Sequence, residues 1–130
     1  MEAVSSAHEP IRVLIADDHR LFAEALEAIL ATDNRIDIVG HASDGREAVE
    51  LAARSQPDVI LMDISMPVMD GVEATREIVG RDGAPSILML TGSNARADVD
   101  RARKAGAVGY VTKDRIAAEL IDAIVEIASR

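Results

Sequence analysis

Ionisable and hydroxyl side chains stand where the apolar runs of this sequence end. Asp17 and Asp18 follow the first run, Asp63 ends the third, Thr91 ends the fourth, and Lys113 follows the fifth. Three carboxylates within a few ångströms of one another cannot all stay ionised unless a cation joins them. Oxygen ligands of this hardness favour Mg2+, which keeps waters and takes one or two carboxylates together with a phosphate oxygen.

Such a group of residues is suited to phosphoryl transfer. A carboxylate oxygen can attack phosphorus and form an acyl phosphate, while a metal spreads the developing charge. Lys113 could bind the transferred group as a point charge, and the Thr91 hydroxyl could donate a hydrogen bond to it. Singly, each residue has an ordinary role, because an Asp-Asp pair often caps a helix and a lone lysine is usually on the surface. The interpretation depends on these residues meeting at one place.

Alternating strands and helices must bring them there. Five short apolar runs alternate with five segments of helical periodicity, which predicts one doubly wound α/β domain with a parallel sheet. In such sheets ligands bind outside the carboxyl ends of the strands, where the acids, the threonine and the lysine would lie. Asp44 and Asp70 each precede a Glu by three residues, as in capping boxes. The expected strands are Ile11–Ala16, Ile36–Ala42, Asp58–Asp63, Ser86–Thr91 and Val108–Thr112, and the expected helices are 20–32, 44–55, 71–80, 95–105 and 114–129.

Composition narrows the classes of function. The chain has 14 basic and 23 acidic side chains, a net charge of −9 and 2% aromatic residues, so we do not expect this fragment to bind nucleic acid by itself. It has no cysteine and no apolar run of the roughly 20 residues that cross a bilayer. Residues 1–10 lack a secretion signal and are interpreted as a flexible leader before one domain over 11–130. The expected compartment is the cytoplasm, without membrane contact.

Four segments carry motifs whose spacings fit together. They are Ile15-Ala-Asp-Asp-His19, Asp63-Ile-Ser-Met-Pro-Val-Met-Asp-Gly71, Thr91 and Gly109-Tyr-Val-Thr-Lys113. With them, the span from about Ile11 to Arg130 resembles the receiver domain of two-component response regulators. The resemblance implies a flavodoxin-like (βα)5 fold with strand order 2-1-3-4-5. It also implies a protein that a sensor histidine kinase phosphorylates and that turns over no separate substrate.

The same resemblance assigns a role to each site residue. Asp63 is expected to be the phosphoacceptor and a metal ligand, with Mg2+ bound beside it and Mn2+ as a possible substitute. The other expected roles are Asp18 as direct metal ligand, Asp17 as metal ligand through water, the backbone carbonyl of Ser65 as the last protein ligand, Lys113 as phosphoryl ligand, and Thr91 and Tyr110 as a conformational relay.

One position departs from the commonest receiver pattern. Many receivers place Pro after the lysine, whereas Asp114 follows Lys113 here, so we expect no cis bond and expect Asp114 to cap the fifth helix. This pair, the Asp-Asp-His motif and the stretch Val39–Gly45 are similar to the NarL/FixJ subfamily, which couples a receiver to a C-terminal helix-turn-helix domain. No such domain follows in this sequence, so we expect either a removed effector domain that controls transcription or a stand-alone receiver.

Two surfaces have unusual apolar patterns. Large apolar residues cover about half of the helix at 114–129 and are similarly broad on the helix at 20–32, more than one core face needs. Either these helices mediate homodimerisation or they cover each other. The helix at 95–105 has only a thin stripe of Ala95, Val99 and Ala102. It is therefore expected to be the mobile element that repacks with the following strand and helix.

Three other functions fit part of the pattern. A haloacid-dehalogenase-type enzyme also forms an aspartyl-phosphate, but it needs a second Asp where this chain has Ser65. A flavin-binding flavodoxin needs a hydroxyl-rich loop after the first strand, where Asp17 and Asp18 would repel phosphate. A degenerate receiver that acts only as a protein-interaction module should have lost an acid or the lysine, and none is lost.

Overall fold

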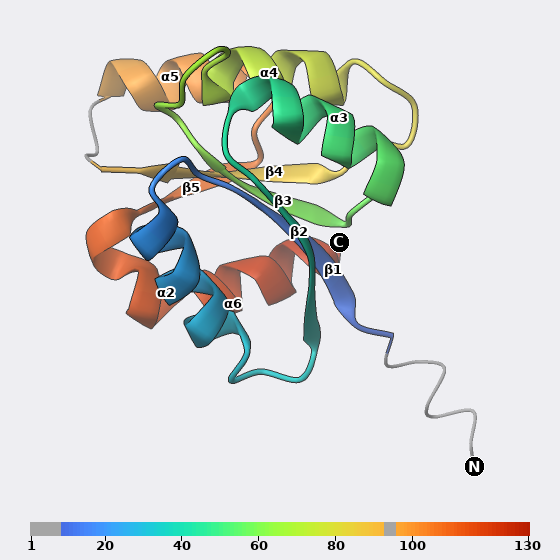
Figure 1. The fold of residues 1–130 in the computed structure, drawn as a ribbon, viewed down its shortest axis with the longest axis vertical. Coiled ribbons are helices and arrows are strands. Elements are labelled where there is room, and N and C mark those ends of the chain that lie inside the picture. Colours follow the sequence, from blue (N-terminus) through green and yellow to red (C-terminus); the bar gives the residue numbers. More distant parts are fainter. Residues whose placement is uncertain (1–8, 93–95) are drawn as a thin grey trace.

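The computed structural model describes residues 9–92 and 96–130, in which a parallel sheet lies between two layers of helices (Figure 1). The strands are β1 (Ile11–Ala16), β2 (Ile36–Ala42), β3 (Val59–Asp63), β4 (Ser86–Thr91) and β5 (Gly109–Thr112). The helices are α2 (Arg20–Leu30), α3 (Gly45–Ser55), α4 (Gly71–Val79), α5 (Arg96–Ala105) and α6 (Ile116–Ala128), with a short 3-10 helix, η1 (Lys113–Arg115).

The strands lie in the order β2-β1-β3-β4-β5, and each adjacent pair is parallel. The predicted flavodoxin-like fold and strand order are thereby confirmed. Every residue of β3 is buried, as are Val13–Ala16 of β1 and Ile87–Thr91 of β4. These strands are continuously apolar because helices cover both faces of the sheet.

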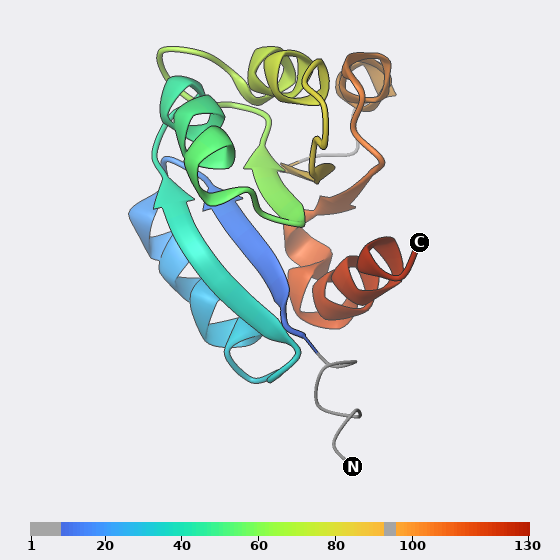
Figure 2. The same cartoon turned by 90° about the vertical axis from the view of Figure 1, so that its right-hand side faces the viewer.

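Helices cover both sides of the sheet (Figure 2), and alternate residues along the strands face two separate cores, one on each side. Val13 and Ile15 of β1 pack against α2 and α6. Leu14 and Ala16 pack on the opposite face, where α3, α4 and α5 lie. Fully buried aliphatic side chains fill both cores. The sheet is therefore rigid, and functional groups at its carboxyl edge are held in place.

The helix starts follow the predicted caps at two of three positions. The side chains of Asp44 and Asp70 each accept a hydrogen bond of 2.8 Å from the backbone N–H three residues later, at the starts of α3 and α4. Asp114 was expected to cap the fifth helix, and that prediction is wrong. It lies inside η1, while α6 begins after Arg115, which makes no side-chain cap hydrogen bond. The 3-10 turn adds residues between β5 and α6, which moves the helix start past Asp114.

The boundaries of β1, β2 and β4 are those predicted, and the other elements differ from their predicted bounds by at most two residues. The third and fifth strands begin one residue later than predicted, and the first helix ends at Leu30 rather than at residue 32. The proposed leader falls mostly on residues 1–8, and Ala95 of the predicted fourth helix also lies outside the described residues. None of the described helices combines the length and the apolar character needed to cross a membrane.

Candidate functional site

Three acids from two neighbouring strands meet at the carboxyl edge of the sheet. Ala16 of β1 pairs with Met62 of β3, so Asp17 and Asp63 occupy the next position on adjacent strands. One oxygen each from Asp17, Asp18 and Asp63, and one ring nitrogen of His19, lie within 4.8 Å of one another. The structure therefore brings together all three acids that the sequence analysis selected.

Asp17 is fully buried and only partly satisfied by the protein. Its Oδ1 accepts a hydrogen bond of 2.7 Å from the backbone N–H of His19. Its Oδ2 has no hydrogen-bond partner among the described residues, although the Lys113 ammonium lies 3.5 Å away. A buried carboxylate oxygen without a hydrogen bond is costly, and here the nearby ammonium offsets part of that cost.

Asp63 is 4% exposed and faces this buried acid. Burial raises the pKa of the Asp63 carboxyl, and the negative charge of Asp17 raises it further. The Lys113 ammonium and the backbone N–H of Ser65 act in the opposite direction. The ionised form of Asp63 is thus less favoured than that of a free aspartate, and added positive charge nearby would favour it.

Lys113 reaches the acids from beyond the end of β5, two strands along the same edge from β3, at the start of η1. Its Nζ donates a hydrogen bond to Asp63 Oδ2 at 3.4 Å, and its side chain is 23% exposed. On its other side, the same nitrogen lies 4.4 Å from the ring centroid of Phe22 in α2. The ammonium is therefore held between carboxylates and an aromatic face.

The loop after β3 depends on two glycines. A Cβ on Gly71 would collide with the backbone oxygen of Asp63, and one on Gly45 would collide with that of Met69. Glycine at both positions lets α3 and α4 approach the loop closely. Between them Val68 has a φ of 69° and is 81% exposed, a strained conformation for a β-branched residue. The glycine of the Asp-Gly motif is thus needed because the backbone of Asp63 lies so close to it.

The other predicted site residues surround the acids at different depths. Thr91 ends β4, is 3% exposed and pairs in register with Thr112, the residue before Lys113. Ser65 is exposed in the loop after β3. Tyr110 is 39% exposed on β5, with its ring outside the core. Thr91 therefore lies at the acid edge, whereas Tyr110 lies toward the surface.

Three residues of the site were missed from the sequence. His19 Nδ1 lies 3.2 Å from Asp18 Oδ1 and 3.3 Å from Asp17 Oδ1, and its place directly after the acids was the available signal. His41 Nε2 lies 3.0 Å from the carbonyl oxygen of Asp17 and fixes that backbone. Neither His41 nor Phe22 had a sequence signal, because each reaches the site from another element.

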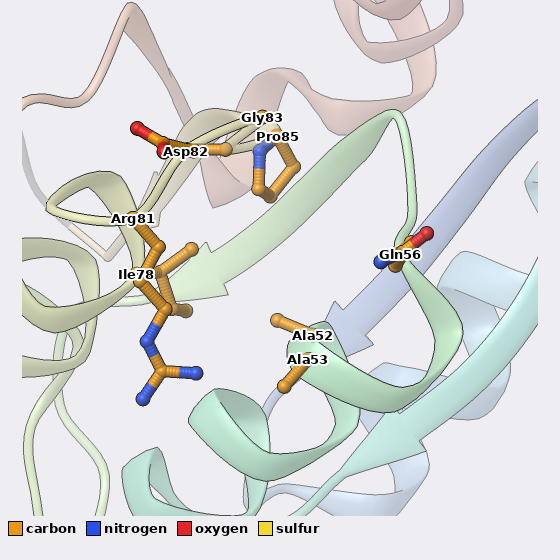
Figure 3. Close-up of a pocket in the computed structure, with 9 residues that line it drawn as sticks. Ala52, Ala53, Gln56, Ile78, Arg81, Asp82, Gly83 and Pro85 are labelled. Atoms are coloured by element: carbon orange, nitrogen blue, oxygen red, sulfur yellow. The ribbon is translucent and has the colours of Figure 1, made fainter.

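Two surface hollows lie at opposite edges of the sheet. A hollow of about 540 Å3 adjoins the acids and is lined by Asp18, His19, the loop after β3, and Asp98 and Arg101 of α5. A hollow of about 200 Å3 lies between the end of α3 and the loop before β4 (Figure 3). The second hollow is lined by apolar side chains together with Gln56, Arg81 and Asp82, whereas the first lies beside the acids.

The chain is similar to known proteins. The family model of the response regulator receiver domain matches residues 13–125. The chain belongs to this receiver-domain family. The transcriptional regulatory protein DegU of Brevibacillus brevis is 42% identical over 118 residues, which are 91% of this chain and 50% of DegU. The chain thus spans about half the length of this curated relative.

Solved receiver structures have the same fold. The signal receiver domain of the response regulator NarL from Mycobacterium tuberculosis is 33% identical, with a TM-score of 0.89 over 93% of this chain and 98% of that one. These two relatives support the NarL/FixJ-like subfamily. A CheX-CheY-BeF3-Mg+2 complex from Borrelia burgdorferi is 25% identical, with a TM-score of 0.86 over 95% of this chain and 92% of that one.

Proposed function

We propose that this receiver domain accepts a phosphoryl group on Asp63 from a sensor histidine kinase, with Mg2+ bound beside it, and passes the change to an output. The observation that carries the proposal is the group formed by a buried Asp63, a second buried acid and a lysine 3.4 Å from Asp63 Oδ2. A carboxylate acts as a nucleophile in proteins where neighbouring charged groups activate it and bind the transferred group, and Lys113 and the second acid are such groups here.

The donor set fits a hard divalent cation. Asp17, Asp18 and Asp63 offer carboxylate oxygens within 4.8 Å of one another, and Ser65 offers a backbone carbonyl in the adjoining loop. Asp17 Oδ2, buried without a hydrogen bond, is suited to accept one from a metal-bound water. Bound Mg2+ would neutralise charge on the acids and on the phosphoryl oxygens. The CheY complex with BeF3 and Mg2+ supports this choice of metal by similarity.

The residues divide the transfer step among them. An Asp63 carboxylate oxygen forms a bond to phosphorus, while the bond from phosphorus to the donor breaks and the donor leaves with the electron pair. The Lys113 ammonium, already beside Asp63 Oδ2, would bind a phosphoryl oxygen as a point charge. The Thr91 hydroxyl, at the end of the neighbouring strand, would donate a hydrogen bond to another.

The output surface would be formed by α5, β5 and α6. Movement of Thr91 toward the phosphoryl group would open space for the Tyr110 ring, which is outward in this structure. Only Ala102 and Ala105 of α5 are buried among its described residues, so this helix can shift at low cost. The relatives DegU and LiaR, transcriptional regulatory proteins of which this chain covers 50% and 54%, support a transcriptional output through a second domain.

Labelling by acetyl phosphate tests the proposal directly. The parent chain should gain one phosphoryl group by intact-mass spectrometry only when Mg2+ or Mn2+ is present, and Asp63→Asn should gain none. Asp37→Asn, at an exposed strand position, serves as the matched control and should label like the parent. Full labelling of Asp63→Asn would show that another residue is the acceptor.

A further inference from the structure

Phe22 is the only phenylalanine in the chain, which has one tyrosine and no tryptophan. It lies in the first turn of α2, is half-buried and packs against the core formed with α6. Its ring faces the Lys113 ammonium, with 4.4 Å between Nζ and the ring centroid. The one phenylalanine therefore touches both the apolar core and the charged edge of the sheet.

The ammonium has attractive partners on two sides. Asp63 Oδ2 and Asp17 Oδ2 lie 3.4 Å and 3.5 Å from Nζ, and the electron-rich face of Phe22 lies beyond it. A cation over an aromatic face is attracted by the ring quadrupole, and more strongly where water is partly excluded. The Lys113 side chain is only 23% exposed. The ring thus restricts a long, flexible side chain that has many other rotamers available.

We propose that Phe22 is a positioning residue for phosphorylation, because its ring holds the Lys113 ammonium where the incoming phosphoryl group must meet it. This inference rests on the proposed function of Asp63. In the step concerned, an Asp63 oxygen forms a bond to phosphorus, and the bond from phosphorus to the acetate oxygen of acetyl phosphate breaks, with acetate leaving as the anion. The ring takes no part in bond making and acts through the lysine alone.

Because the chain has one phenylalanine, the ring atoms of Phe22 can be substituted without changing any other residue. Growth with 4-fluoro-, 3,5-difluoro- or 3,4,5-trifluorophenylalanine changes this one side chain and no other. Fluorine withdraws electron density from the ring face in steps while changing its shape little, so the attraction for a cation falls in steps. The packing of the ring in the core changes far less. The series therefore separates the electrostatic role of Phe22 from its structural role.

We expect the rate constant for labelling by acetyl phosphate, at saturating Mg2+, to fall stepwise along the series, by on the order of tenfold at the trifluoro ring. The melting temperature should stay constant. In the Lys113→Ala background the residual rate should not depend on fluorine. A flat series in the parent background, or a rate that falls only together with the melting temperature, would overturn the proposal.

A second readout does not need phosphorylation. The 19F resonance of 4-fluoro-Phe22 should move when Lys113 is changed to Ala, and should stay in place for Lys104→Ala, the other lysine of the chain. An unmoved resonance in Lys113→Ala would mean that no contact exists. If the unfluorinated parent is never labelled, the proposed function of Asp63 fails, and the positioning role fails with it. If the parent is labelled but its rate does not change along the fluorine series, only the positioning role of Phe22 is overturned.

Discussion

The Lys113 ammonium donates to Asp63 across a third strand. The two residues are 50 positions apart in sequence, and β4 lies between the strands that carry them, yet Nζ and Oδ2 are 3.4 Å apart. The contact crosses β4 because Lys113 lies beyond the end of β5 and its long side chain reaches back over the sheet edge. A point charge held in this way is suited to a group that arrives at Asp63.

Replacing Lys113 by Ala should slow labelling by acetyl phosphate by on the order of a hundredfold, because a preorganised charge for the transferred group is lost. Mg2+ should bind as tightly as before or more tightly, since the competing ammonium is gone from the acids. Intact-mass kinetics and titration calorimetry measure the two effects. Lys104→Ala, in the exposed part of α5, is the matched control and should behave like the parent. Equal labelling rates for Lys113→Ala and the parent would contradict the role of Lys113.

Asp63→Asn should raise the stability of the metal-free protein at neutral pH. The pKa of the Asp63 carboxyl is raised in the folded protein, by burial first and by Asp17 second. The folded state therefore binds more protons than the unfolded state, and stability falls as pH rises from the ordinary pKa of 3.8 through the folded value. The amide of Asp63→Asn carries no charge, so the variant keeps the stability that the parent loses above this pH range.

Melting curves across pH measure this effect. The gain in melting temperature of Asp63→Asn over the parent should be several degrees at neutral pH and should vanish below pH 3.8, where both states of the parent are protonated. Added Mg2+ should stabilise the parent more than the variant, because the parent has the additional ligand. Asp37→Asn should show no such pH-dependent gain. A gain for Asp63→Asn that persists unchanged at low pH would have another cause.

The fold could be predicted from the sequence because its signals are local and repeated. The continuous apolar runs of β1, β3 and β4 indicate strands covered on both faces, and the alternation with helices fixes the class. The end of β5 could not be predicted in the same way. Asp114 has the chemistry of a cap, but η1 places it before the helix. Cap chemistry alone does not decide which turn of a chain begins a helix.

The site likewise contains residues that the sequence could predict and residues that it could not. Asp17, Asp63 and Thr91 could be selected because the ends of parallel strands share one edge, a property of the topology. The contacts of Phe22 with Lys113 and of His41 with the Asp17 carbonyl depend on how α2 and β2 pack beside those ends. Such contacts join elements distant in sequence, and periodicity carries no information about them.

His19 should widen the range of metals that the site binds. Its Nδ1 lies 3.2 Å from Asp18 Oδ1, a spacing that two ligands of one ion adopt. Imidazole favours Co2+ and Ni2+ over Mg2+. His19→Asn should therefore weaken Co2+ and Ni2+ binding by about tenfold and leave Mg2+ binding nearly unchanged. Calorimetry with each metal, and the visible spectrum of bound Co2+, test this. An equal loss of affinity for all three metals would indicate a general effect on the helix start instead.

Helix α5 should be the least protected helix and should respond to phosphorylation. Its described residues bury only Ala102 and Ala105, and its Arg101 is half-exposed, 3.8 Å from Asp70. Amide exchange followed by mass spectrometry should find α5 exchanging faster than α4 and α6. On labelling by acetyl phosphate, exchange should change in α5 and β5 and stay constant in α3. Changes confined to α2, with α5 silent, would contradict the proposed output surface.

The broad apolar surfaces of α2 and α6 lead to the last prediction. Much of the breadth seen in the sequence is used internally, because Leu26 and Leu30 of α2 and Leu120 and Ile124 of α6 are buried in the shared core. What remains on α6 is a half-buried stripe with Ile121 and Val125, four residues apart on one helix face. Helix α2 adds Leu21, which is 81% exposed. The homodimer expectation therefore narrows to a smaller surface than the sequence suggested.

We expect the α6 stripe to join two copies when Asp63 carries a phosphoryl group. Light scattering at high concentration should give a dimer mass with beryllofluoride and Mg2+ and a lower mass without them. Ile121→Glu and Val125→Glu should each abolish the increase, because a charge at the centre of a small apolar interface remains unpaired when buried. Ala53→Glu adds the same charge at an exposed position of α3, in the helix layer on the other side of the sheet, and it should dimerise like the parent. A monomeric parent in both states would leave these side chains with a packing role alone, since α2 and α6 contribute to one shared core.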